Sequence, residues 1–380
     1  MRISEDDVRG ALQYSATQGL PKLVAHLKAI QTAEHQPQQQ WDLCVTSGSQ
    51  DGLTRAFEML LPAGATHSLL LESPTYSGAL AFLGPHGCRR VGVATDKYGL
   101  VPDDLERVLE TWDDVNGSQP RPRILYTIPT GSNPTGGSLS LERKQRIYEI
   151  ARHPANNLII LEDDPYYYLQ FGSSDEENGK IERVPSFFSL DIDGRVIRFD
   201  SFSKLLSAGC RIGFVSAAPE IIDRLTLHIQ STALHTSGVS QLLVAALLDR
   251  WEDHHNDGHA TIEPTRGFER HVQLVSRFYR ERRDLFVQSA EKHLTGLAEW
   301  TVPTAGMFSW IKLNNVNDSM DLIQSKAVDA KVLFVPGGVF MPNSEPSPYV
   351  RASFSTASPE QIDEALARLR KLLLYESGTA

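Results

Sequence analysis

The sequence predicts an α/β protein with a large domain built on a mostly parallel, seven-stranded sheet and a smaller α+β domain. Short apolar, β-rich runs recur along the first 216 residues, and helical patterns lie between many of them. After about residue 262 the pattern changes to long helices and a few strands. The length of 380 residues and an apolar fraction of 41% provide material for a sizeable core.

Several of the predicted strands are apolar without strict alternation, as expected for strands that are buried on both faces. The seven runs are Leu43–Thr46, Ser68–Glu72, Arg90–Ala94, Ile124–Ile128, Leu158–Glu162, Val196–Asp200 and Ile212–Ser216. A helical pattern at Asp51–Leu61 follows the first run. Another at Leu141–Arg152 precedes the fifth, with Ser140 as its expected cap.

We expect three parts along the chain: an N-terminal segment at 1–35, a large domain at 36–262 and a small domain at 263–380. The N-terminal segment is predicted to be helical from Leu20 to Ala33 and to pack with the small domain. The small domain is predicted to hold helical regions at both ends and strands between them: Glu263–Leu294, Gly306–Leu313, Lys331–Val335 and Pro359–Leu374.

Composition disfavours several classes of function. The 37 basic and 47 acidic residues give a net charge of −10, which offers no basic field for nucleic acid or an anionic membrane. No apolar run is long enough to span a bilayer. Three cysteines without a CxxC pair predict a reducing compartment. The acidic residues at positions 5–7 fit neither a secretory signal nor a transit peptide, so we expect a cytoplasmic protein.

A lysine directly after the sixth predicted strand is the first candidate catalytic residue. Ser201, Ser203 and Lys204 lie together there, and Arg211 follows seven residues later. Two hydroxyls and a guanidinium can hold a phosphate dianion. A partly desolvated lysine has a lowered pKa, which makes it a nucleophile for a carbonyl. Although a lone lysine at a strand end is usually solvated surface, this combination is typical of a pyridoxal 5′-phosphate site.

The pyridine ring of that cofactor needs a carboxylate beside its nitrogen. Asp163 and Asp164 follow the fifth predicted strand, at the edge where an α/β sheet places its ligands. We predict Asp164 for this role. The alternative is that one of two adjacent acids only starts the turn before Pro165.

Residues at other strand ends could meet the remaining needs of the cofactor. Ser49 and Gln50 begin a helix whose free N–H groups favour an anion, although a serine is equally common as a plain cap. Asn133 and Tyr167 could donate to the 3′ oxygen, although Asn133 could instead form an ordinary Asn-Pro turn. Tyr76 is placed to stack on the ring, with a core tyrosine as the alternative.

Together these motifs resemble the fold-type I pyridoxal-phosphate transferases, and more closely the kynurenine/α-aminoadipate aminotransferase family. The similarity runs over nearly the whole chain and is carried by residues 12–15, 42–50, 131–136, 162–171, 193–198, 200–204 and 351–355. The resemblance implies transfer of an amino group from kynurenine, 2-aminoadipate or an aromatic amino acid to a 2-oxo acid such as 2-oxoglutarate. One site would serve both substrates in turn, in a ping-pong mechanism.

The resemblance also implies a role for each candidate residue. Lys204 forms the imine with the cofactor and moves the proton, and Asp164 pairs with the ring nitrogen. The cofactor phosphate is bound by Ser49, Gln50, Ser201, Ser203 and Arg211. The 3′ oxygen is held by Asn133 and Tyr167, and Tyr76 covers the ring. The amino-acid substrate binds through Arg351, Asn133 and Tyr76.

The resemblance further implies a homodimer with shared active sites, since Tyr14 would reach the site of the other subunit. Family members carry a few dozen residues ahead of the part that matches from Ile3 onward. That arm would close over the substrate and could include a mitochondrial address, which makes a mitochondrial location the alternative to a cytoplasmic one.

Other functions remain open from the sequence. The same cofactor could serve β-elimination from cysteine conjugates, because the motifs place the cofactor without selecting the bond that breaks. The chain could also be a non-catalytic module that binds the cofactor, although its acidic charge disfavours a DNA-binding regulator. A metal site at His254–His259 is a weaker alternative. His255 and His259 have helical spacing, but Gly258 and the polar neighbours are typical of a solvated loop, so we expect no metal.

Overall fold

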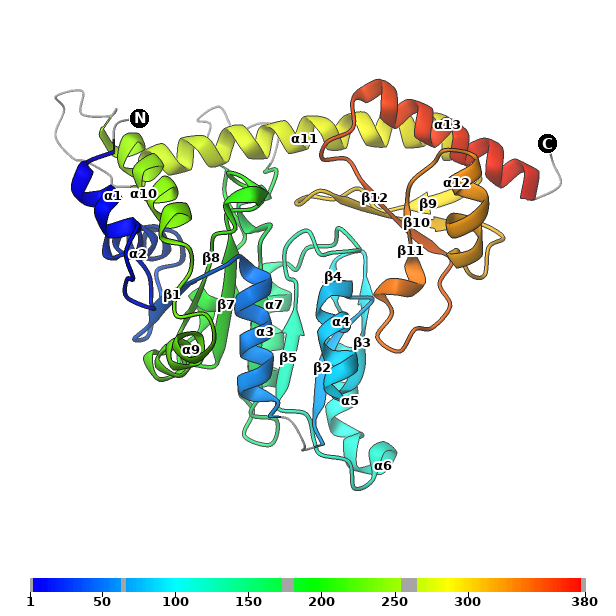
Figure 1. Ribbon diagram of the computed structural model, residues 1–380. Coiled ribbons are helices and arrows are strands. Elements are labelled where there is room, and N and C mark those ends of the chain that lie inside the picture. The colour runs from blue at the N-terminus through cyan, green and yellow to red at the C-terminus, as the bar shows by residue number, and fades with distance from the viewer. Residues whose placement is uncertain (1–2, 63–65, 173–180, 254–264, 377–380) are drawn as a thin grey trace.

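A computed structural model describes residues 3–62, 66–172, 181–253 and 265–376. Two sheets form the centres of a large and a small domain, and one long helix runs across both (Figure 1). The predicted fold class is confirmed, because the large sheet is mainly parallel and the small sheet is antiparallel.

The large sheet has the strand order β1-β8-β7-β6-β5-β2-β3-β4. Its strands are β1 (Asp42–Thr46), β2 (Ser68–Ser73), β3 (Arg89–Asp96), β4 (Gly99–Leu100), β5 (Ile124–Thr127), β6 (Ile159–Asp163), β7 (Val196–Ser201) and β8 (Gly213–Ala217). The five central strands from β7 to β3 pair in parallel, whereas β8 and β4 run against their neighbours. All seven predicted strands are present. The eighth, β4, has only two residues, which are too few to form a sequence pattern.

Successive residues of the central strands contact two different cores, one on each face of the sheet. Leu161 and Tyr126 belong to one core, whereas Ile160 and Leu125 belong to the other. Helices cover both faces and add residues to these cores: α3 (Ser49–Leu60), α4 (Ser77–His86), α5 (Pro102–Glu110), α7 (Leu141–Arg152), α8 (Phe187–Leu190), α9 (Pro219–Thr232) and α10 (Gly238–Asp253). The short helix α6 (Trp112–Asn116) follows α5. Polar residues that follow the parallel strands therefore gather at one edge, which faces the small domain (Figure 1).

The N-terminal helices α1 (Glu5–Ala11) and α2 (Pro21–His35) lie against the large domain. They contact α10 and β1, and the backbone N–H of Leu20 donates to Gln241 of α10 at 2.7 Å. Figure 1 shows both helices at the end of the large sheet that is remote from the small sheet. Within the described residues, the expected packing of residues 1–35 with the small domain is therefore not found. The buried side of α2, with Leu23 and Leu27, instead packs with α10 and β1 of the large domain.

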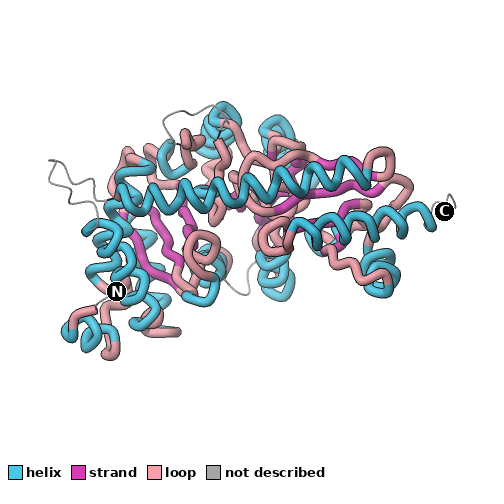
Figure 2. Tube along the Cα trace, turned by 90° about the horizontal axis from the view of Figure 1, so that it is seen from above, coloured by secondary structure: helices cyan, strands magenta, loops and turns pink. Residues whose placement is uncertain are grey.

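The long helix α11 (Arg266–Leu294) belongs to both domains. Near its start, Ser276 donates to the carbonyl of Gln170 in the large domain at 2.6 Å. Toward its end it packs beside α13 (Pro359–Glu376), as the views from the front and from above both show (Figures 1 and 2). The predicted boundary at 262/263 therefore lies close to the start of a helix that the two domains share.

The small sheet has the antiparallel order β11-β12-β10-β9. Its strands are β9 (Ala298–Trp300), β10 (Phe308–Leu313), β11 (Val335–Pro336) and β12 (Tyr349–Ser353), with the short helix α12 (Ala327–Asp329) beside them. The strand predicted at Lys331–Val335 begins only at Val335, because Lys331 has a φ of 54° and closes the turn after α12. No described helix is both long and apolar enough to cross a membrane.

Candidate active site

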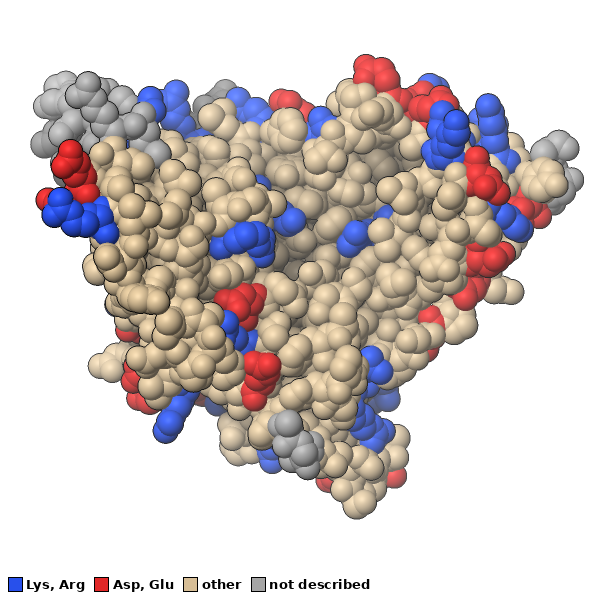
Figure 3. All heavy atoms as spheres, viewed as in Figure 1, with Lys and Arg blue, Asp and Glu red and all other residues tan. Residues whose placement is uncertain are grey.

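A cavity of about 330 Å³ lies between the carboxyl edge of the large sheet and the facing side of the small sheet. Side chains of both domains line it: Ser49, Gln50, Tyr76, Ile128, Asn133, Asp163, Pro165, Tyr166, Ser201, Ser203, Lys204, Ala208, Arg211, Phe308 and Arg351. Figure 3 shows a hollow between the domains with lysine or arginine side chains on both sides. All the predicted site residues line this cavity except Asp164, Tyr167 and Tyr14.

One corner of the cavity has the features of an anion site. The guanidinium of Arg211 donates to the hydroxyl of Ser203 and to the carbonyl of Ser47, both at 3.1 Å. Gly48 has a φ of 89°, which favours glycine, and a Cβ atom there would lie 2.3 Å from the Arg211 guanidinium and would displace it. Ser49 begins α3, and the free N–H groups and dipole of that helix end favour negative charge.

Lys204 follows β7 in a turn that also lines the cavity. The hydroxyl of Ser201 accepts a hydrogen bond from the Ser203 N–H at 3.1 Å and so helps to fix this turn. Burial lowers the pKa of Lys204, and the positive charges of Arg211 and Arg351 lower it further. A larger share of this amine is therefore neutral, which is the form that attacks a carbonyl.

Tyr76 lies just before α4 on the wall of the cavity. A Cβ atom at Gly78 would lie 2.3 Å from the Tyr76 ring, so this glycine allows the ring to lie against the first turn of the helix. Burial raises the pKa of Tyr76, and the nearby Asp163 raises it further, so the phenol stays neutral. A neutral aromatic ring at this position can cover a planar cofactor.

Arg351 enters the cavity from β12 of the small domain. Its Nη1 donates to the Asn133 side-chain oxygen at 2.8 Å. The guanidinium carbon lies 4.3 Å from the centre of the Phe308 ring and 5.0 Å from that of Phe340. The buried Nε has no hydrogen-bond partner among the described residues. A guanidinium with free donors in this setting is suited to a carboxylate.

Asp163, and not the predicted Asp164, faces the cavity. The hydroxyl of Tyr126 donates to Asp163 Oδ2 at 2.8 Å, and Oδ1 is buried without a hydrogen-bond partner in the described part of the chain. Asp164 instead accepts hydrogen bonds from Thr130 at 3.1 Å and Arg198 at 3.3 Å. Adjacent residues at a strand end point to opposite sides of the sheet, so the prediction of Asp164 is displaced by one residue.

The same displacement applies to the tyrosine. Tyr167 donates to Glu34 at 3.1 Å, and its ring lies 4.7 Å from the Arg198 guanidinium, away from the cavity. Tyr166 lines the cavity instead. The sequence could not separate the two pairs, because Asp163 and Tyr166 have the same spacing as Asp164 and Tyr167. In the structure, Leu161 is buried on the same face of the sheet as Tyr126. Asp163 follows two residues later on β6 and therefore lies on that face, whereas Asp164 does not.

A buried ionic cluster lies on the other side of β6 and β7. Arg198 contacts Glu162 at 3.2 Å, Asp164 at 3.3 Å and Asp200 at 2.9 Å. Burial raises the pKa of Asp164 to about 6, although the charges of Arg198 and Lys144 oppose this rise. Asp164 therefore belongs to an internal charge network and not to the wall of the cavity.

Tyr14 lies outside the cavity of its own chain. Its side chain is 83% exposed and its ring meets His235 edge to face at 6.1 Å. The exposed side chain is available to a partner subunit, and its contact with the site of that subunit stays a prediction.

The cavity residues fit pyridoxal 5′-phosphate. Arg211 and the start of α3 suit its phosphate, and Lys204 suits its aldehyde. The unpartnered Oδ1 of Asp163 offers an acceptor for a protonated ring nitrogen. The group, when bound, supplies an electron sink for charge that develops on the substrate.

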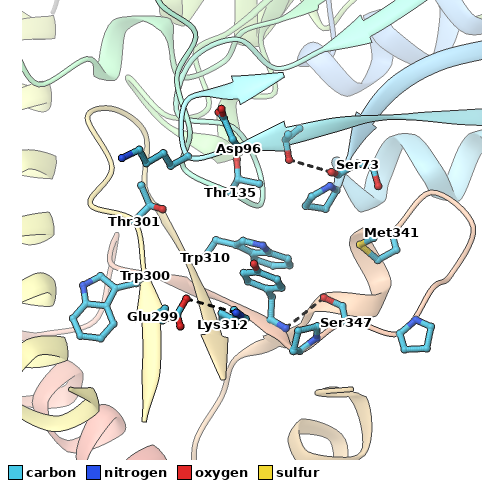
Figure 4. Close-up of a pocket in the computed structure, with 16 residues that line it drawn as sticks. Ser73, Asp96, Thr135, Glu299, Trp300, Thr301, Trp310, Lys312, Met341 and Ser347 are labelled. Carbon is cyan, nitrogen blue, oxygen red and sulfur yellow. Dashed lines mark hydrogen bonds and ion pairs between the residues drawn. The ribbon is translucent and has the colours of Figure 1, made fainter. Parts of the chain in front are cut away.

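A second cavity of about 440 Å³ lies between the β3–β4 hairpin and the small sheet. Trp310 stacks on Tyr349 there at 5.2 Å, and Lys312 pairs with Glu299 at 3.6 Å (Figure 4). None of the predicted site residues lines it, and the anion-binding features described above lie in the first cavity. The first cavity is therefore the candidate active site.

The described residues contain no group of three or more His, Cys, Asp or Glu that could hold a metal ion. The histidine-rich stretch at His254–His259 lies outside them.

Residues 3–369 match the family described as aminotransferase class I and II, and the chain therefore belongs to this family of pyridoxal-phosphate-dependent enzymes. Within it, the chain is similar to the mitochondrial kynurenine/alpha-aminoadipate aminotransferase of Bos taurus. The two are 43% identical over 98% of this chain and 85% of the relative. The resemblance that the sequence motifs indicated is confirmed.

Solved structures support the same assignment. The aromatic aminotransferase Aro9 from C. albicans has a TM-score of 0.87 at 28% identity, with 100% of this chain and 85% of that chain covered. LysN, the alpha-aminoadipate aminotransferase from Thermus thermophilus, has a TM-score of 0.82 at 31% identity, with coverage of 98% and 86%. The predicted aminotransferase activity is therefore confirmed at the level of the enzyme class.

Proposed function

We propose that this aminotransferase moves the amino group of L-kynurenine or L-2-aminoadipate to 2-oxoglutarate, with aromatic amino acids as further donors. The observation that supports this proposal most directly is that Arg351 of the small domain and Lys204 of the large domain line the same cavity. An amino acid needs one group for its α-carboxylate and one base near its α-carbon. The names of the relatives favour these donors.

We assign substrate binding, proton transfer and the contacts with the cofactor ring to residues of this chain. Arg351 binds the α-carboxylate of the substrate, helped by Asn133. Nζ of Lys204 would remove the proton from the α-carbon of the substrate as a general base and would deliver it, as a general acid, to the cofactor carbon that takes the amino group. Asp163 keeps the ring nitrogen of the cofactor protonated, and Tyr76 covers the ring.

The remaining assignments concern cofactor binding. Asn133 and Tyr166 hold the 3′ oxygen, so that Tyr166 takes the place predicted for Tyr167. The phosphate is held by Ser49, Gln50, Ser201, Ser203 and Arg211, which all line the cavity.

We also propose a homodimer. Several large apolar side chains are exposed around Tyr14: Leu12, Leu234, Val239 and Leu243. A Cβ atom on Gly238 would lie 2.2 Å from the carbonyl oxygen of Ala11, so the two segments that carry these residues lie side by side. A second copy of the chain would cover this surface. Light scattering of the holoenzyme should give twice 42.2 kDa, and a monomer would contradict the dimer.

The compartment stays a prediction. The sequence predicts a cytoplasmic location, whereas the names of three similar relatives include the word mitochondrial. Those names favour the mitochondrial alternative.

A donor panel tests the proposed substrates. The protein with pyridoxal 5′-phosphate and 2-oxoglutarate is offered kynurenine, 2-aminoadipate, phenylalanine and a cysteine S-conjugate in turn, and glutamate is measured. We expect the highest kcat/KM for kynurenine or 2-aminoadipate. Pyruvate and ammonia from the conjugate without glutamate would indicate a lyase, and cofactor binding without any product would indicate a non-catalytic module.

Arg351→Gln should raise the KM for every amino donor by about 10- to 100-fold. A charge-assisted hydrogen bond contributes about 1.5–3 kcal/mol, and about 1.4 kcal/mol corresponds to tenfold in binding. Initial rates over a range of donor concentrations measure this change. Arg351→Lys keeps the positive charge but loses the planar guanidinium, so its KM should lie between those of the wild type and Arg351→Gln. An unchanged KM in Arg351→Gln would place the carboxylate elsewhere.

A further inference from the structure

Tyr126 lies directly behind the carboxylate that faces the cavity. It is on the central strand β5 and is fully buried. Its hydroxyl donates to Asp163 Oδ2 at 2.8 Å, while Oδ1 of the same carboxylate has no partner among the described residues. One oxygen of Asp163 is thus held from behind, and the other is left for a ligand in the cavity.

The position of the Tyr126 ring is fixed by its strand and by packing. In the register of β5 and β6, Tyr126 lies opposite Leu161, two residues before Asp163 on the same face of the sheet. Phe57 of α3 meets the Tyr126 ring edge to face at 5.8 Å. These contacts direct the hydroxyl toward Asp163 and leave the ring little freedom to turn away.

Tyr126 remains a hydrogen-bond donor at any ordinary pH. Burial raises its pKa well above the usual value, and the negative charges of Asp163 and Glu72 raise it further. A phenol that stays protonated next to a carboxylate favours the ionised form of that carboxylate.

Asp163 needs this support because its surroundings oppose its negative charge. Burial raises the pKa of Asp163 to about 7, and the charges of Asp164 and Asp200 contribute to the rise, whereas Tyr126 and Arg198 oppose it. The titratable and charged groups around it come from β2, β5, β6, β7 and the cavity wall: Glu72, Tyr126, Asp164, Arg198, Asp200, Tyr76 and Tyr166.

We propose that Tyr126 is a positioning residue that holds Asp163 ionised and aimed into the cavity, so that Asp163 can keep the ring nitrogen of the cofactor protonated. The proposal rests on the role of Asp163 proposed above. Tyr126 itself does not line the cavity and acts only through the carboxylate.

Tyr126→Phe tests the proposal, because it removes the hydroxyl and keeps the ring that packs on Phe57. The direct readout is the ¹⁵N chemical shift of pyridoxal 5′-phosphate labelled at the ring nitrogen, recorded on the holoenzyme across pH without substrate. We expect the nitrogen to lose its proton at lower pH than in the wild type, and kcat to fall about 10- to 100-fold with little change in KM. Because no substrate is present, the nitrogen signal reports on Tyr126 even if the proposed donors are wrong.

Tyr148→Phe is the matched control. The hydroxyl of this tyrosine also lies within hydrogen-bond distance of carboxylates, Asp191 at 2.9 Å and Asp193 at 2.7 Å, but the residue belongs to the core on the opposite face of the sheet. It should leave the nitrogen titration and kcat at wild-type values. A wild-type nitrogen titration in Tyr126→Phe would overturn the proposal.

A second substitution keeps the test decisive if Tyr126→Phe does not fold. 3-Fluorotyrosine at position 126 keeps the hydroxyl and makes it a stronger donor. It should move the nitrogen titration in the opposite direction, toward higher pH. No movement, or movement toward lower pH, would contradict the role of Tyr126.

Discussion

Lys204→Ala is expected to lower kcat by at least about 10⁴-fold and to abolish the visible absorption that the bound cofactor shows in the wild type. The change removes the nucleophile and the general base together, and general acid–base catalysis alone contributes about 10²- to 10⁴-fold. Lys204 is the only lysine among the described residues that line the cavity, so no other described amine can replace it. Glutamate formation and the absorption spectrum measure the two effects.

Lys97→Ala is the matched control for this prediction. Lys97 lines the second cavity between the domains and not the first. Its removal should leave both the rate and the spectrum unchanged. If Lys204→Ala retained a rate within tenfold of the wild type, the assignment of the catalytic amine would be wrong.

Asp163→Asn is expected to lower kcat about 10²- to 10³-fold while the cofactor still binds. A neutral amide cannot stabilise a protonated ring nitrogen, and the loss of one such electrostatic partner in an active site costs about this much. The adjacent substitution, Asp164→Asn, should leave kcat within a few-fold of the wild type, because Asp164 faces Arg198 and not the cavity.

Asp164→Asn should instead change the pH dependence of the free energy of unfolding. Burial raises the pKa of Asp164 from 3.8 to about 6, so the ionised carboxylate lowers the free energy of unfolding of the wild type as the pH rises through this range. The neutral amide lacks this loss, and Arg198 keeps Glu162 and Asp200 as partners, so above pH 6 the variant should be at least as stable as the wild type. Steady-state rates and urea unfolding of both variants measure the contrast. A larger loss of kcat in Asp164→Asn than in Asp163→Asn would show that Asp164, as predicted from the sequence, pairs with the ring nitrogen of the cofactor.

The sequence predicted most of the cavity because of how parallel strands end. Tyr76, Asn133 and Lys204 each follow a different strand of the large sheet. Parallel strands bring their carboxyl ends to one edge, so residues that are remote along the chain become neighbours. A local pattern of strand and polar turn was therefore sufficient to place these side chains in one site.

The features that escaped prediction depend on long-range packing. Arg351 meets Asn133 across 218 residues of sequence, and only the family resemblance indicated it. The choice between Asp163 and Asp164 depends on which face of β6 each one occupies. The two helices of the N-terminal segment pack on α10 and β1, a contact that no local pattern reveals. In the sequence, Tyr126 has the pattern of an ordinary core residue in a buried strand.

The most direct test of the central claim is a half-reaction on the purified protein. The chain is loaded with pyridoxal 5′-phosphate, and L-kynurenine, L-2-aminoadipate or L-glutamate is added without any 2-oxo acid. We predict that the visible band of the bound cofactor is replaced by the band of its amine form, and that 2-oxoglutarate restores the first band. A visible band that forms and that none of these amino acids converts would contradict the proposed transamination at this cavity.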